Sequence, residues 1–170
     1  MKKLANYLIV SILIILTSCG GNGTEETTPK NNEKPILSKQ DATKKVWKDF
    51  TVRGVGNTMA EMKFDIGNIT VEEGSWVRIT LVNEGVDNAM QHNIVFINYG
   101  TRKEIASQAI TAGSSMKYVP DNDDVIAASD LAMPGETVVL EFEAPSKGNY
   151  EYLCTYPGHG EIMRGYFFVK

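Results

Sequence analysis

The sequence is poor in histidine and cysteine, two of the side chains that bind transition metals. Its 170 residues include two histidines, His92 and His159, and two cysteines, Cys19 and Cys154. Because we assign Cys19 to an N-terminal targeting segment, where it is lipidated, Cys154 is left without a cysteine partner. We therefore expect no disulfide bond within the mature chain. The sequence also lacks an internal repeat and a glycine-rich phosphate loop, and its net charge of −4 argues against nucleic acid as a partner.

Long hydrophobic runs are also absent, since the apolar run Tyr7–Leu16 is too short for a transmembrane helix. It follows a basic start and leads into Leu16-Thr17-Ser18-Cys19, which resembles a bacterial lipobox. We predict a lipoprotein signal peptide over residues 1–18 and lipidation of Cys19; a plain secretory signal is the alternative. Lipidation would anchor the protein to a membrane of the bacterial cell envelope, facing the periplasm or the cell exterior.

A polar segment separates this signal from the rest of the chain. Residues 19–42 are rich in Gly, Thr, Asn, Glu and Lys and nearly free of hydrophobic residues, so burial cannot offset the entropy of ordering them. We interpret the segment as a flexible, lipid-anchored linker, and a disordered tail without a role is the alternative. Gly20 follows Cys19, so the aspartate of the common inner-membrane retention signal is missing. Residues 43–170 then form one domain.

Strand signals dominate this domain. Short runs of alternating or β-branched residues are separated by Gly, Pro and Asn turn signals, which is typical of an all-β sandwich. The predicted strands cover Trp47–Val52, Met62–Ile66, Ile69–Val71, Trp76–Val82, His92–Ile97, Thr137–Phe142, Tyr150–Cys154 and Tyr166–Val169. One helix interrupts them at Thr101–Ala112, where Ile105 and Ala109, and likewise Ala106 and Ile110, are spaced i, i+4 on one apolar face.

The stretch from Cys154 to Met163 holds a thiolate, an imidazole and a thioether with the spacing C-x4-H-x3-M. Together with His92 upstream, it supplies two histidines, one cysteine and one methionine, the ligand set of a blue-copper electron-transfer site. Cu(I) favours soft sulfur ligands and Cu(II) favours imidazole, so a mixed set tolerates both oxidation states. Singly, each residue is more often structural; jointly, with this spacing, they predict one type 1 copper ion.

Four functions are compatible with some or all of these ligands. A one-electron carrier uses all four. A copper oxidase or nitrite reductase needs further histidines, and a dinuclear purple centre needs a second cysteine in the loop; the chain has neither, so we expect no enzyme activity. A copper chaperone or reservoir is the alternative to the carrier. Zinc also binds Cys and His, but a methionine ligand and a single thiolate are not typical of structural zinc sites.

Two motifs resemble those of azurin and the related auracyanins, members of the cupredoxin family. They are Met90-Gln91-His92-Asn93 and the run from Cys154 to His159, Cys-Thr-Tyr-Pro-Gly-His. Plastocyanin-like proteins have a shorter gap between the cysteine and the histidine. The resemblance covers about Asp49 to Lys170 and implies a Greek-key β-sandwich with a helical insertion between the middle strands.

The resemblance also implies a role for each residue of the site. His92, Cys154 and His159 would be the equatorial copper ligands, Met163 the long axial ligand, and the backbone carbonyl of Gln91 a weak contact on the opposite axis. In the second shell, Asn93 would tie the two ligand segments together near Thr155, and backbone N–H groups at the sulfur would raise the reduction potential. Azurin has Gly at the position of Gln91, Trp at that of Ile94, and a disulfide that is missing here.

In this family the loop histidine is the electron port, and here that residue is His159. The apolar patch around it would comprise Met62, Ala89, Met90, Pro157, Gly158 and Ile162. Such a surface suits brief contacts with redox proteins such as c-type cytochromes or respiratory complexes. From Lys44 onward the chain carries 12 basic and 17 acidic residues, a modest acidity that favours basic partners.

Overall fold

The computed structural model describes residues 45–170. Cys19, the predicted signal peptide over residues 1–18 and the predicted linker over residues 19–42 lie outside the described residues, so these three assignments stay predictions. Among residues 45–170 there is no helix long and apolar enough to cross a membrane.

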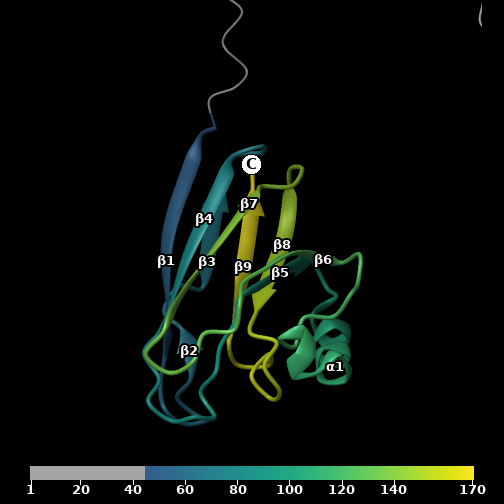
Figure 1. Ribbon diagram of the computed structural model, residues 1–170. Coiled ribbons are helices and arrows are strands. Elements are labelled where there is room, and N and C mark those ends of the chain that lie inside the picture. The colour runs from purple at the N-terminus through teal and green to yellow at the C-terminus, as the bar shows by residue number, and fades with distance from the viewer. Residues whose placement is uncertain (1–44) are drawn as a thin grey trace, which may run out of the picture. The chain divides into compact units, whose positions relative to one another are not determined.

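Two sheets face each other in this domain (Figure 1). The first has the order β2-β1-β4-β7 and the second the order β3-β9-β8-β5-β6. Two pairs are parallel, β1 with β4 and β3 with β9, while the other neighbours are antiparallel. The strands are β1 Trp47–Val55, β2 Lys63–Phe64, β3 Asn68–Val71, β4 Trp76–Asn83, β5 Val95–Asn98, β6 Val125–Ala128, β7 Thr137–Glu143, β8 Gly148–Leu153 and β9 Arg164–Val169. The predicted all-β sandwich is confirmed.

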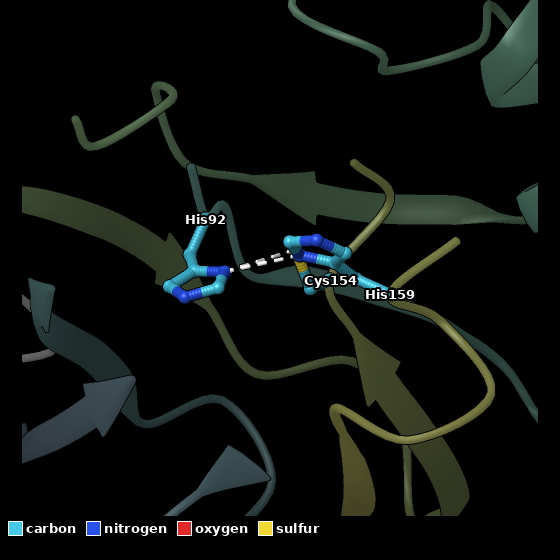
Figure 2. A group of neighbouring side chains, drawn as sticks. All are labelled: His92, Cys154 and His159. Carbon is cyan, nitrogen blue, oxygen red and sulfur yellow. Dashed lines mark hydrogen bonds between the residues drawn. The ribbon is translucent and has the colours of Figure 1, made fainter. Parts of the chain in front are cut away.

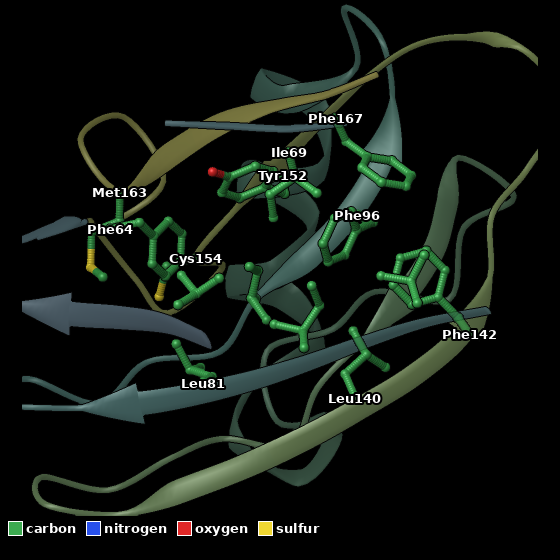
Figure 3. Close-up of a cluster of buried hydrophobic side chains, with 14 of the residues drawn as sticks. Phe64, Ile69, Leu81, Phe96, Leu140, Phe142, Tyr152, Cys154, Met163 and Phe167 are labelled. Carbon is green, nitrogen blue, oxygen red and sulfur yellow. The ribbon is translucent and has the colours of Figure 1, made fainter. Parts of the chain in front are cut away.

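The core forms where the apolar faces of the two sheets meet. Strand β4 shows the alternation clearly, because Val77, Ile79 and Leu81 are fully buried while the residues between them are partly exposed. Further along the core, the ring of Phe96 lies 4.7 Å from that of Phe142 and 5.0 Å from that of Phe167, centroid to centroid. Figure 3 shows Cys154 and Met163 at the opposite end of this core from Phe142.

Three strand predictions differ from the structure. The strand predicted from His92 begins at Val95, and His92 instead forms an isolated bridge with Ala132. The run Met62–Ile66 contributes only the two residues of β2. Strand β6 was not predicted, because all four of its residues are half-buried and the sequence therefore shows no alternation.

Helix α1, Arg102–Ala112, confirms the helix predicted over Thr101–Ala112 and lies between β5 and β6 in the chain. Ile105 and Ala109 are fully buried, and Ile105 packs in a cluster with Leu153 of β8. Ile110, however, is 62% exposed, because it points about a quarter-turn away from Ala109 around the helix. Gly113, whose φ of 69° suits glycine, caps the end of the helix, and a short 3-10 helix, Ser114–Met116, follows.

Candidate metal centre

The loop between β8 and β9 gathers three of the four predicted ligands. Cys154 directly follows β8 and Met163 directly precedes β9, and these strands are antiparallel neighbours. Backbone bonds close the loop: the N–H of Cys154 donates to the carbonyl of Met163 at 2.9 Å, and the N–H of Met163 donates to that of His159 at 2.9 Å. His92 arrives from the segment before β5, which pairs with β8. The pairing of β5 with β8, and of β8 with β9, within the second sheet therefore brings these residues together.

The side chains of His92, Cys154 and His159 converge (Figure 2). The two Nδ1 atoms are 3.2 Å apart, and Sγ of Cys154 lies 3.9 Å from Nδ1 of His92 and 3.7 Å from Nδ1 of His159. The point equidistant from these three atoms lies about 2.1 Å from each, close to metal–nitrogen and metal–sulfur bond lengths in proteins, about 2.0–2.3 Å. The triangle thus has the size to hold one metal ion.

The protonation of these groups suits metal binding. Burial lowers the pKa of His92 to about 4, with a further contribution from His159, and burial alone lowers the pKa of His159 to about 4. Both imidazoles are therefore neutral at pH 7 and have a lone pair to donate. Burial raises the pKa of the Cys154 thiol to about 12, so a bound cation has to displace its proton. Two nitrogens and one soft sulfur fit copper.

Hydrogen bonds from the backbone also reach the sulfur. The N–H groups of Asn93 and Tyr156 act against the effect of burial and lower the pKa of Cys154, because they stabilise the thiolate. The carbonyl oxygen of Gln91 lies 4.0 Å from Sγ of the same cysteine. The sulfur therefore has two backbone donors and a carbonyl dipole nearby.

Met163, the predicted axial residue, is fully buried beside the three converging side chains. Its methyl carbon Cε and the ring carbon Cδ2 of His92 both border Gly54, 3.5 Å and 2.8 Å from where a Cβ on that glycine would lie. The structure therefore brings all four predicted ligand side chains and the Gln91 carbonyl to one end of the core.

Asn93 connects three segments around the site. Its Nδ2 donates to Oγ1 of Thr155 at 2.8 Å and to the carbonyl of Lys117 at 3.1 Å, while its Oδ1 accepts from the N–H of Thr155 at 2.8 Å. The contact with Lys117 was not predicted. It depends on the turn after helix α1, where Lys117 has a positive φ of 52°, and no sequence motif signals that turn.

The predicted apolar patch is wrong in two residues. Met62 is fully buried and Met90 is 4% exposed, because both side chains pack into the core between the sheets. The other predicted members are accessible to differing degrees: Ala89 and Gly158 are exposed, Ile162 is 44% exposed and Pro157 is half-buried.

Met59, which is 47% exposed, belongs to this surface and was not predicted from the sequence. Its methyl carbon lies 3.3 Å from where a Cβ on Gly158 would be, so it borders the ligand loop. His159 itself is 1% exposed, so the ring edge is nearly covered. Only the contact with Gly158 identifies Met59 as a member of this surface, because a single methionine before a strand does not indicate a surface contact in the sequence.

Comparison with known proteins shows the family of this chain. Residues 51–170 match the family described as copper binding proteins, plastocyanin/azurin family. The chain belongs to this family. It is 30% identical to auracyanin-A of Chloroflexus aurantiacus over 175 residues, covering 100% of this chain and 98% of that protein. The solved structure of auracyanin A, a "blue" copper protein from the same bacterium, matches with a TM-score of 0.66 and 32% identity, covering 73% of this chain and 99% of the other.

A third relative is outer membrane protein H.8 of Neisseria meningitidis. It is 30% identical over 110 residues, which cover 61% of this chain and 60% of that protein.

Family membership and the His-Cys-His triangle together confirm the predicted chemistry. The protein is a blue-copper electron-transfer protein of the plastocyanin/azurin family, and its site takes one type 1 copper ion. It is an electron carrier and not an enzyme, and the cupredoxin-type sandwich predicted from the sequence is confirmed by its structural neighbours.

Proposed function

We propose that this protein carries single electrons between redox proteins of the bacterial cell envelope, with Met163 as axial ligand to a copper held by His92, Cys154 and His159. The observation that supports this most directly is the buried triangle of two imidazoles and one thiol. When bound, copper supplies the one-electron couple. The visible and electron paramagnetic resonance spectra of the copper-loaded protein test the proposal.

The chain's own residues keep the geometry of this site nearly constant during electron transfer. Burial of all four side chains excludes water from the centre. Asn93 joins the segment of His92 to the segment of Cys154 through its bonds with Thr155, so the two ligand segments move together. A fixed, dry site needs little rearrangement on electron transfer, and N–H groups directed at the sulfur favour the reduced state.

Met163→Leu tests the axial assignment. Leucine has a similar volume but no sulfur, so the protein should keep copper while the reduction potential rises on the order of 60 mV, a tenfold change for a one-electron couple. Voltammetry measures this shift. Leu140→Met, the converse exchange near the other end of the core (Figure 3), is the control and should leave the potential unchanged. A fall in the potential of Met163→Leu would contradict the assignment of Met163 to the copper axis.

The partners we propose are redox proteins such as c-type cytochromes or respiratory complexes. His159 carries the electron to the surface formed by Met59, Gly158 and Ile162, where the exposed apolar side chains lie against the ligand loop. A small apolar contact releases quickly, as repeated electron transfer requires. The acidity of the domain favours basic partners.

The lipobox-like Leu16–Cys19 supports a location in the cell envelope, with the protein anchored through a lipid on Cys19. The likeness to a protein named outer membrane protein H.8 agrees with it. Cys19→Ala should move the protein from the membrane fraction to the soluble fraction and leave the blue spectrum unchanged, because Cys19 is no copper ligand. Fractionation followed by immunoblotting measures this. Equal membrane retention of both forms would rule out the anchor.

A further inference from the structure

The backbone of β1 passes directly beside the imidazole of His92. A Cβ atom on Gly54 would lie 2.8 Å from Cδ2 of His92, 3.5 Å from Cγ of the same ring and 3.5 Å from Cε of Met163. Gly54 is not among the glycines with positive φ, so its backbone does not require glycine. Glycine is required here for space, since a strand glycine often marks a close approach of another group.

The neighbour of Gly54 in the sheet is Asn83 of β4, whose side chain bonds both the backbone before His92 and the segment bridged to His92. This side chain is 1% exposed. Its Nδ2 donates to the carbonyl of Met90 at 2.6 Å and to that of Ala132 at 3.0 Å. Met90 precedes His92 by two residues, and Ala132 exchanges two backbone hydrogen bonds with His92, at 3.1 Å and 2.8 Å.

The orientation of the His92 ring depends on packing more than that of most metal-ligating histidines does. Such histidines nearly always donate their second ring nitrogen to a carboxylate or carbonyl, which fixes the ring orientation. In His92 the second nitrogen, Nε2, is buried, and residues 45–170 offer it no hydrogen-bond partner. Since Nδ1 faces Cys154 and His159, the orientation of the ring is set by the atoms packed against its sides.

We propose that Gly54 and Asn83 form a cradle that positions His92 for copper. Gly54 leaves room for the ring beside Met163, and Asn83 holds the segment that carries it. Both belong to the first sheet, whereas His92 precedes β5 and Cys154 follows β8, which are paired strands of the second sheet, so the cradle supports the His92 side of the site from the opposite sheet. This inference rests on the proposed role of His92 as a ligand.

The first test compares Gly54→Ala and Asn83→Ala with the wild-type full chain. Each should lower the affinity for Cu(II) by roughly 10- to 100-fold, the range for changes in the shell around metal ligands, and shift the visible band and the copper hyperfine splitting. Gly67→Ala is the control for Gly54, because a Cβ there meets no atom within 4 Å and its φ is not positive. Asn98→Ala is the control for Asn83, because its Nδ2 bonds Asp124 and not the His92 segment. Affinities and spectra equal to wild type in both cradle variants would overturn the proposal.

A second test uses the metal-free protein and distinguishes the cradle from the copper assignment. Urea unfolding is measured for the wild type, Gly54→Ala, His92→Ala and the double variant, which isolates the coupling between the two sites. We expect Gly54→Ala to destabilise the chain when the imidazole is present and to have little effect when it is absent. A variant that folds only after His92 is also replaced shows the same coupling. Equal destabilisation in both backgrounds would contradict the cradle. A wild-type protein without a blue spectrum would contradict the copper role of His92, not this coupling.

Discussion

Cys154→Ser should abolish the intense blue absorption and the narrow copper hyperfine splitting while the domain keeps its fold. The band requires charge transfer from a thiolate sulfur to copper, and Cys154 is the one cysteine within residues 45–170. Serine nearly matches the shape of cysteine. The metal-free protein keeps the thiol neutral because burial raises its pKa to about 12, so a neutral hydroxyl is a fair replacement. The N–H groups that face the sulfur, from Asn93 and Tyr156, can hydrogen-bond the new oxygen.

Visible absorption tests the loss of the blue band, and circular dichroism on the same sample tests whether the fold is kept. Far-ultraviolet circular dichroism should match the wild type, and copper that still binds should give ordinary tetragonal signals. Cys19→Ser is the matched control, because it removes the other cysteine and should leave the blue band intact. A blue band that survives in Cys154→Ser would show that the thiolate of the site lies elsewhere.

The metal-free protein should lose stability steeply as the pH falls from 6.5 to 4. The pKa values of His92 and His159 are both lowered from 6.5 to about 4, so the unfolded chain binds more protons than the folded chain in this window. Their contribution is complete above pH 6.5 and is lost as the pH falls towards 4. For each histidine it amounts to roughly 3 kcal/mol, since lowering a pKa by one corresponds to about 1.4 kcal/mol. The raised pKa of Cys154 acts in the opposite direction, so its contribution is lost above about pH 9.

Urea unfolding at pH 7.5, 5.5 and 4.5 measures the loss. His159→Gln, which cannot gain a proton in this range, should remove about half of it. The copper-loaded protein should show a smaller loss, because bound copper holds the imidazoles unprotonated. A free energy of unfolding that stays constant from pH 7.5 to 4.5 would show that the two imidazoles are not buried in the metal-free protein.

The parts of the fold and site that depend on nearby residues were predictable from the sequence. The alternation in β4 and the i, i+4 pair of Ile105 and Ala109 are local patterns, and both are present in the structure. Three ligand positions lie within ten residues, so their spacing already indicated a site. His92 was predictable because the chain holds few histidines and because Met90-Gln91-His92-Asn93 is a recognisable motif.

Features that depend on distant contacts were not predictable. Met62 and Met90 look like patch residues in the sequence, and only the packing of two sheets shows that they are core. Gly54 lies 38 positions before His92, and nothing in its own neighbourhood signals that a ring will pass beside it. Strand β6 exists because β5 offers it an edge to pair with, not because of its own pattern.

We propose that two imidazoles, one thiolate and one thioether hold a single copper ion in a blue site. The decisive measurement is the visible and electron paramagnetic resonance spectra of the protein loaded with Cu(II). We predict an intense thiolate-to-copper band, a narrow copper hyperfine splitting and a stoichiometry of one copper per chain. A colourless protein, or one that gives only ordinary tetragonal copper signals, would contradict the claim and would favour a copper reservoir or a zinc site.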